Sequence, residues 1–220
     1  MRFLADVWWR LVRFGFRLLY NELAFTYDLV SWVVSLGAWR CWQQSVIQFL
    51  PPPDDGPLLE VAHGTGNLHI DLKQAGYQVI GLDYSPYMGH ITHRKLQRRG
   101  LPLQLCRGRG QQLPFATGIF SSIVCTFPTS FVFEESTLNE FHRVLTHEGY
   151  ALLVLSGVFI GGGPFKAFLT WLYRVTGQGA SEEAAKEVLS AFQDSPFGKV
   201  ETHIVDCPRS QAYVIVLRKT

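Results

Sequence analysis

Short apolar runs alternate with segments of helical apolar spacing along most of the chain, which predicts strands separated by helices. Short apolar runs bounded by turn residues predict strands, and apolar residues that recur every three or four positions predict helices. Strands are expected at 57–62, 78–83, 102–106, 120–126, 149–155, 200–206 and 212–218. Helices are expected at 67–75, 85–99, 135–145 and 181–192. Ser85 and Ser181 provide N-terminal capping signals for two of these helices.

The alternation of strands and helices constrains the architecture. Right-handed crossovers between successive strands predict a parallel sheet with helices on both faces. Only a short turn around Pro208 separates the last two strands, so they must pair antiparallel. The sequence therefore predicts an α/β, Rossmann-like sheet of seven strands with an antiparallel pair at its end.

The first 50 residues have a different, strongly aromatic pattern. The run Pro51-Pro52-Pro53-Asp54-Asp55-Gly56 is a stiff linker, so we expect a helical cap segment at 1–50 and an α/β domain at 51–220. At about 100° per residue, the charged residues of the first helix share one arc of about 80°. These residues are Arg2, Asp6, Arg10, Arg13 and Arg17, and Trp8 and Trp9 lie beside them.

Two interpretations of this amphipathic helix stay open. Residues 1–19 could lie in a membrane interface, attracted by anionic lipids. Alternatively, the helix covers the substrate pocket or the sheet and keeps its arginines in water. The arginines also interrupt the apolar region, so a secretory signal is not expected.

Composition narrows the class of protein. The chain is 47% hydrophobic and 17% charged, yet no apolar run is long and clean enough to span a bilayer. A net charge of +2 gives no electrostatic footprint for nucleic acid. Cys41, Cys106, Cys125 and Cys207 show no C-x-x-C spacing, so we expect neither a disulfide framework nor a metal site. A reducing, cytoplasmic location is expected; the membrane interpretation of the N-terminal helix would add peripheral contact on the inner face of the membrane.

The chemistry is concentrated in the turn after the first strand. Small residues at Ala62, Gly64 and Gly66 let a ligand approach the backbone closely, and the next helix directs its free N–H groups toward that ligand. The second strand ends in Asp83, which can accept hydrogen bonds from ribose hydroxyls. Together they predict an adenosine site; the simpler alternative is a structural turn beside a surface aspartate.

The spacing A-x-G-x-G selects among adenosine ligands. It lacks the third glycine of a dinucleotide fingerprint, which argues against a dinucleotide oxidoreductase. Glu60, just before the turn, would repel a pyrophosphate. Its carboxylate suits the ammonium group and sulfonium centre of S-adenosylmethionine.

Several ordered blocks resemble the class I S-adenosylmethionine-dependent methyltransferases, most closely the branch related to ubiquinone and menaquinone methyltransferases. Residues 59–66 are similar to motif I of that family, 81–88 to G-h-D-h-S-x-x-M, 108–115 to G-D-A-x-x-L-P-F, and Tyr27-Asp28-Leu29 to Y-D-x. The resemblance implies strand order 3-2-1-4-5-7-6 and a substrate-covering insertion at 157–180. It also implies cofactor-binding roles for Glu60, Ala62, Gly64, Gly66, Asp83, Tyr84, Met88, Arg109, Gly110, Gln111, Thr126 and Tyr27.

Two departures from the family pattern keep a second hypothesis open. Ala62 stands where the family usually has glycine, and Arg109 replaces an acid that often touches the adenine amino group. An arginine cannot accept that hydrogen bond. The alternative is therefore a non-catalytic protein of the same fold that binds a nucleoside, a lipid or a partner protein.

Methyl transfer needs alignment of nucleophile, methyl and sulfur in a dry pocket, so it leaves no catalytic signature in a sequence. His63, inside the turn, is the candidate for a polar role near the methyl group, and Phe127, Pro128 and Thr129 are expected to line the pocket mouth. The aromatic stretch at 158–175 and the N-terminal helix suggest an apolar, lipid-like or quinone-like acceptor. No N-P-P-Y-like block follows the fourth strand, so nucleic acid is not the expected substrate.

Overall fold

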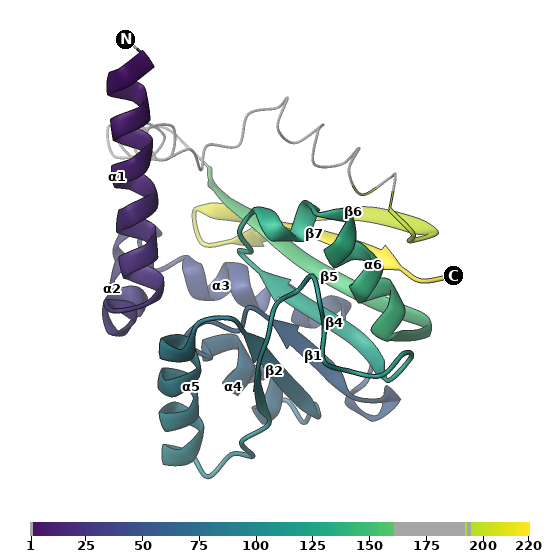
Figure 1. Cartoon of the computed structure of the whole chain (residues 1–220). Helices are drawn as coiled ribbons and strands as arrows, with labels where there is room; N and C mark the ends of the chain where they lie inside the picture. The colour runs from purple at the N-terminus through teal and green to yellow at the C-terminus, as the bar shows by residue number, and fades with distance from the viewer. Residues whose placement is uncertain (1, 161–191, 193–194) are drawn as a thin grey trace.

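A computed structural model describes residues 2–160, 192 and 195–220 (Figure 1). Its centre is a seven-stranded sheet in the order β3-β2-β1-β4-β5-β7-β6, which confirms the predicted topology. The strands are β1 (Leu58–Val61), β2 (Val79–Asp83), β3 (Leu105–Arg107), β4 (Phe120–Thr126), β5 (Leu145–Phe159), β6 (Lys199–Cys207) and β7 (Ser210–Arg218). β1 pairs in parallel with β2 and β4, and β7 pairs antiparallel with β5 and β6.

Helices cover both faces of the sheet, as expected. Besides α4 (Asn67–Gln74), α5 (Pro86–Arg98) and α6 (Glu135–Val144), the N-terminal part contributes α1 (Arg2–Tyr20), α2 (Tyr27–Val34) and α3 (Trp39–Gln44). Four 3-10 turns complete the described elements: η1 (Ala24–Thr26), η2 (Ile47–Phe49), η3 (Pro53–Asp55) and η4 (Ser130–Phe133). Ser85 caps α5 as predicted, because its Oγ accepts the Met88 N–H at 3.3 Å.

Side chains at alternate positions along the strands pack into two hydrophobic cores. Leu59 packs with the cluster that contains Phe141 of α6, whereas Leu58 packs with the cluster that contains Leu72 of α4 and Trp42 of α3. This is the period of two that strands impose on their side chains. Burying each such side chain contributes roughly 1.5–3 kcal/mol. Because β1 pairs in parallel with β2 and β4, the carboxyl ends of these strands lie at one edge of the sheet. The two cores support the sheet on both faces.

β5 is longer than its apolar run predicts. It continues to Phe159 because the antiparallel partner β7 pairs with it as far as Ser210. The first residues of the expected insertion, 157–159, thus belong to a strand. Residues 161–180 of that insertion, and most of the expected helix at 181–192, lie outside the described part of the chain.

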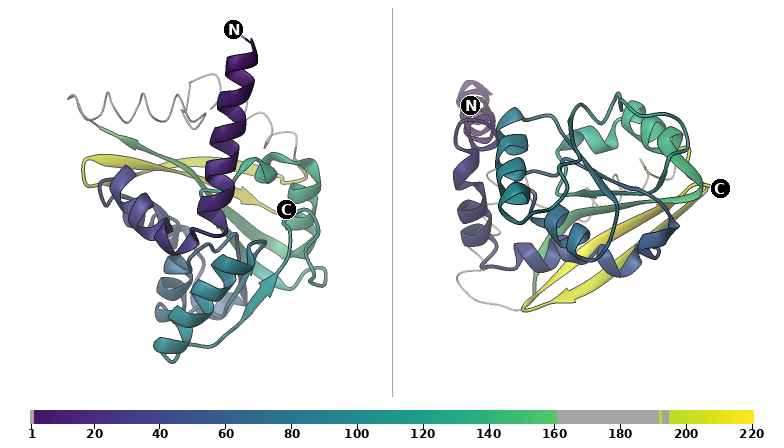
Figure 2. Two further views of the ribbon diagram at one scale, coloured as in Figure 1. Left: turned by 60° about the vertical axis from the view of Figure 1, so that its left-hand side comes forward. Right: turned by 90° about the horizontal axis from the view of Figure 1, so that it is seen from below.

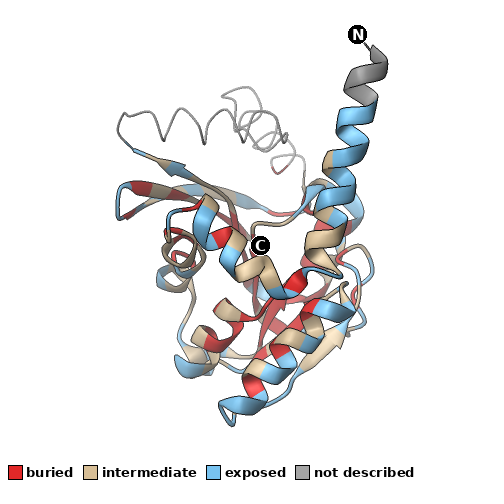
Figure 3. Ribbon diagram, turned by 90° about the vertical axis from the view of Figure 1, so that its left-hand side faces the viewer, coloured by how far each residue is buried: buried red, intermediate tan, exposed pale blue. Residues whose placement is uncertain are grey.

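The N-terminal part divides into two sections. α1 projects from the body and is largely exposed (Figure 3), and none of the described helices is long and apolar enough to cross a bilayer. In contrast, α3 joins the core through Trp42, which is 1% exposed. The linker at Pro51 therefore marks a change in composition within one shared core.

The expectation that the cysteines stay unpaired is wrong for Cys41 and Cys207. They form a disulfide with their Cα atoms 6.0 Å apart, across a sequence separation of 166. Spacing along the chain could not show this pairing, because it arises from the packing of α3 against the β6–β7 hairpin. Trp42 Nε1 donates to Ser210 Oγ at 3.0 Å at the same contact. The cysteines therefore no longer support the inference that the protein resides in a reducing compartment.

Candidate cofactor site

The turn between β1 and α4 adopts left-handed backbone conformations. Ala62, Gly64 and Gly66 have φ values of 57°, 55° and 76°. A Cβ at Gly66 would come within 2.4 Å of Thr92, so only glycine fits there, whereas a Cβ at Gly64 would meet nothing within 4 Å. The turn is therefore closed on the side of α5 and open above Gly64, where a ligand could approach.

Asp83 lies against this turn, as the sequence predicted. Its Oδ2 accepts the Gly64 N–H at 2.8 Å, and its Oδ1 accepts the Ser85 N–H at 2.8 Å. A carboxylate has about four acceptor positions, so further hydrogen bonds can be accepted from a bound sugar. The strand-end acid and the glycine turn form a single unit at the carboxyl edge of the sheet.

Glu60 is buried beneath the turn. Its side chain is 3% exposed and its Oε2 lies 2.8 Å from Nδ1 of His69, which is 0% exposed. Burial of a carboxylate is costly without such a partner. Sequence reasoning missed His69, although its place in the first turn of α4 directs it back toward β1. Nε2 of His69 has no hydrogen-bond partner among the described residues.

His63 is also buried, at 4% exposure. Its Nδ1 lies 2.9 Å from the Gly64 carbonyl oxygen and 3.3 Å from Thr92 Oγ1. Gly81 on β2 makes room for the imidazoles, because a Cβ there would come within 3.0 Å of both His63 and His69. These contacts support the shape of the turn; a role of His63 near the transferred methyl stays a prediction.

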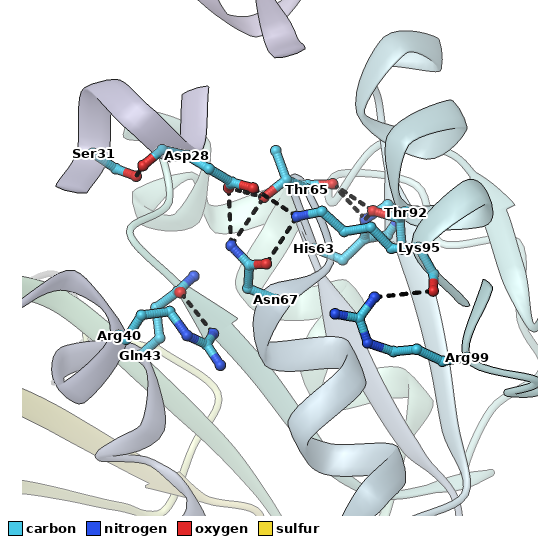
Figure 4. A network of polar contacts seen from close by, with 11 residues as sticks. Asp28, Ser31, Arg40, Gln43, His63, Thr65, Asn67, Thr92, Lys95 and Arg99 are labelled. Carbon is cyan, nitrogen blue, oxygen red and sulfur yellow. Dashed lines mark hydrogen bonds and ion pairs between the residues drawn. The ribbon is translucent and has the colours of Figure 1, made fainter. Parts of the chain in front are cut away.

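Asp28 of α2 fastens the cap segment to the turn (Figure 4). Its carboxylate accepts hydrogen bonds from Thr65 Oγ1 at 2.5 Å, Asn67 Nδ2 at 2.9 Å and Lys95 Nζ at 2.7 Å. Burial alone would raise the pKa of Asp28, but the bonds from Lys95, Thr65 and Asn67 lower it below its ordinary value. The sequence indicated Asp28 only as part of a motif, and the structure makes it the link between α2, α4 and α5.

Two tyrosines of the cap segment lie near Asp83. The rings of Tyr20 and Tyr27 are 5.7 Å apart, and Ser85 Oγ donates to the Tyr20 carbonyl oxygen at 2.7 Å. Desolvation raises the pKa of both phenols, and the negative charge of Asp83 adds to the increase. Tyr27, an expected cofactor residue, is therefore a neutral hydroxyl beside the site.

Arg109 has its own partner at the outer edge of the site. Its guanidinium lies 4.8 Å from the centre of the Tyr84 ring and donates to the Tyr84 hydroxyl at 3.0 Å. This hydrogen bond lowers the pKa of Tyr84. Arg107 approaches the same ring at 5.6 Å. The structure thus brings Tyr84 and Arg109 together as an exposed cationic and aromatic edge next to Asp83.

The remaining expected site residues lie in the loop after β3, at the end of β4 and in α5. A Cβ at Gly110 would come within 2.7 Å of Phe131, and Gln111 donates to Glu134 at 3.1 Å. Thr126 ends β4 and is buried, and Met88 is 1% exposed within α5. Among the expected pocket-mouth residues, Phe127 instead stacks on Trp39, with ring centroids 3.9 Å apart.

The substitution Ala62→Gly is expected to raise the free energy of unfolding by about 0.5–1 kcal/mol. A left-handed conformation costs an L-residue about 1–2 kcal/mol, and the extra chain entropy of glycine offsets part of this gain. Urea denaturation measures the difference. Ala75→Gly is the matched control, because Ala75 has φ −78° and glycine brings no relief there. A less stable Ala62→Gly protein would contradict the strain.

Comparison with known proteins shows that the central part of this chain is similar to methyltransferases. Residues 59–153 match the family model "Methyltransferase domain". A demethylmenaquinone methyltransferase of Thermus thermophilus is 32% identical over 134 residues, which cover 60% of this chain and 61% of that protein. One of Deinococcus radiodurans is 30% identical over 158 residues, covering 68% and 65%. The chain thus spans less than two thirds of the length of these relatives.

Solved structures support the fold. The crystal structure of a putative S-adenosylmethionine-dependent methyltransferase of Methanococcus maripaludis aligns with TM-score 0.64 and 17% identity, over 91% of this chain and 94% of that one. A geranyl diphosphate C-methyltransferase of Streptomyces coelicolor aligns with TM-score 0.59 and 15% identity, over 81% and 75%. The family match and the curated relatives confirm the resemblance that the ordered sequence blocks indicate.

Proposed function

We propose that this chain, a member of the class I S-adenosylmethionine-dependent methyltransferases, transfers a methyl group from S-adenosylmethionine to a small, apolar or lipid-like acceptor. The observation that carries this proposal is the 2.8 Å hydrogen bond between the Gly64 N–H and Asp83. It joins a sugar-binding acid to a turn that is open above Gly64.

The residues present fit this cofactor. The free acceptor positions of Asp83 suit two ribose hydroxyls. The first turn of α4 directs N–H groups and the positive end of its dipole toward a carboxylate. Asp83 places an acidic group at the turn, which suits a ligand with an ammonium and a sulfonium, and the buried Glu60 carboxylate lies beneath the turn beside His69. When bound, the cofactor supplies a methyl group already activated by that sulfonium.

The chain's own contribution is to align the reactants and exclude water. Asp83 and the turn fix one end of the cofactor, while Tyr20 and Tyr27 cover the neighbouring space with neutral phenols. Asp28 holds that cover in place through Thr65 and Lys95. Fixed geometry in a dry site supplies much of the rate of a displacement of this kind.

The acceptor follows from the surroundings of the site. The relatives of Thermus thermophilus and Deinococcus radiodurans are demethylmenaquinone methyltransferases, a name that refers to an apolar quinone. α1 ends at Tyr20 beside the site, and further along this helix Leu11 and Phe14 are exposed, as are Arg10, Arg13 and Arg17. We infer that residues 1–19 contact an anionic membrane surface, from which an apolar acceptor reaches the site.

Titration calorimetry with S-adenosylmethionine and S-adenosylhomocysteine tests the cofactor assignment. We expect saturable heat with both ligands, and transfer of labelled methyl to an isoprenoid naphthoquinol in a second assay. Absence of heat at millimolar ligand would favour a non-catalytic protein of this fold. The specific observation behind that alternative is Arg109, whose guanidinium is engaged with Tyr84 where the family has an acid.

A further inference from the structure

The segment around α2 exposes an unusual number of large apolar side chains. We call them the cap patch: Leu23, Phe25, Leu29, Trp32, Val33 and Leu36, which are between 42% and 75% exposed. Single exposed apolar residues are ordinary on a protein surface, but a contiguous group marks a site of interaction.

The polarity of α2 is inverted relative to a typical surface helix, which turns its apolar face inward. Asp28 is bonded to Thr65 and Lys95, and Ser31 is 7% exposed. Ser35, just after the helix, is 0% exposed and accepts the Trp39 N–H at 3.1 Å. The polar side of this segment therefore faces the protein, and its apolar side faces outward. The exposure of this apolar face to water is energetically unfavourable.

We propose that the cap patch docks on the surface of an anionic lipid bilayer, together with α1. The two helices lie along the same edge of the molecule (Figure 1 and the right-hand view of Figure 2). Arg10, Arg13 and Arg17 of α1 are exposed there, whereas the charge of Asp28, whose side chain is 41% exposed, is paired with Lys95. Apolar side chains on one segment and arginines on the neighbouring helix fit lipid tails and anionic headgroups. A second copy of the chain would present the same arginines and is disfavoured by charge.

The inner side of α2 gives the docking a consequence for the site. Asp28 connects the segment that carries the cap patch to Thr65 in the glycine turn at 2.5 Å. Docking would therefore place the cofactor turn beside the bilayer, where an apolar acceptor resides. This last step rests on the proposed function, whereas the docking itself does not.

Co-sedimentation of the full chain with vesicles tests the docking without cofactor or acceptor. The vesicles are phosphatidylcholine alone, or phosphatidylcholine mixed with phosphatidylglycerol. The double variant Leu29→Gln with Trp32→Gln is expected to bind mixed vesicles roughly tenfold less tightly or worse, because two interfacial side chains are lost. Leu103→Gln with Ile204→Gln removes two exposed apolar side chains elsewhere and should leave binding unchanged.

Further measurements separate the outcomes. Equal thermal midpoints of the two double variants show that the cap variant is folded; if it is unfolded, the single variant Leu29→Gln takes its place. The wild-type protein should bind vesicles of phosphatidylcholine alone more weakly than mixed vesicles. Deletion of residues 1–18 should abolish binding. Both results would support a docking surface that is partly basic and partly apolar. Unchanged vesicle binding in the cap variant overturns the proposal. So does a dimer that this variant converts to monomers, since a second copy then covers the patch. If the wild-type protein binds vesicles as expected but transfers no methyl group, that result counts against the proposed function alone.

Discussion

Asp83→Asn is expected to weaken the binding of S-adenosylmethionine roughly 100-fold or more. Asp83 accepts one N–H through each oxygen, from Gly64 and from Ser85. An asparagine has one acceptor oxygen, so its NH₂ group must face one of these backbone donors. Charge-assisted hydrogen bonds contribute about 1.5–3 kcal/mol each, and a tenfold change in affinity corresponds to about 1.4 kcal/mol.

Titration calorimetry gives the affinity of the Asp83 variant, and Asp54→Asn is the control. Asp54 is an exposed acid in η3, so the same change of charge should leave affinity unaltered there. Wild-type affinity in the Asp83→Asn protein would show that the ribose is not held at this strand end. The cofactor site would then have to be sought elsewhere.

Cys41→Ser is expected to lower the free energy of unfolding by about 2–5 kcal/mol. The disulfide with Cys207 closes a sequence separation of 166, and long closed loops restrict the unfolded chain most. For a chain of this size the loss corresponds to a midpoint about 4–20 °C lower. Calorimetric melting and urea denaturation measure it.

Two controls separate the covalent bond from the thiol. Cys106 is a free, half-buried cysteine, and Cys106→Ser should lower the free energy of unfolding by only about 1 kcal/mol. A reducing agent should destabilise the wild type and leave Cys41→Ser unaffected. If the wild type and Cys41→Ser unfold at the same denaturant concentration in oxidising buffer, the disulfide does not contribute to the free energy of unfolding as proposed.

Local patterns predicted the parts of this fold that depend on neighbouring residues. Short apolar runs located the buried strands, Ser85 indicated the start of α5, and the proximity of Gly64 and Asp83 followed from adjacent parallel strands. β5 was underestimated at both ends, because its start follows α6 directly and its end depends on pairing with β7. Pairing of that kind is not encoded in the segment itself.

The missed parts depend on packing between distant segments. Nothing near Cys41 or Cys207 in the sequence indicates their bond, and His69 became important only once Glu60 was buried against it. The cap patch was missed for a related reason. The sequence of α2 shows which residues share a face, but the partners of Asp28 decide which face turns inward.

Two of the contacts that fasten the N-terminal segment to the domain differ in their chemistry. One fastening is covalent, between Cys41 and Cys207, and the other is the ionic group around Asp28. Because the pKa of Asp28 is lowered, its stabilising contribution is complete above the ordinary carboxyl range and is lost only as the solution becomes strongly acidic. Thiols break the first contact and acid weakens the second, so their contributions to the stability of the folded chain can be removed independently.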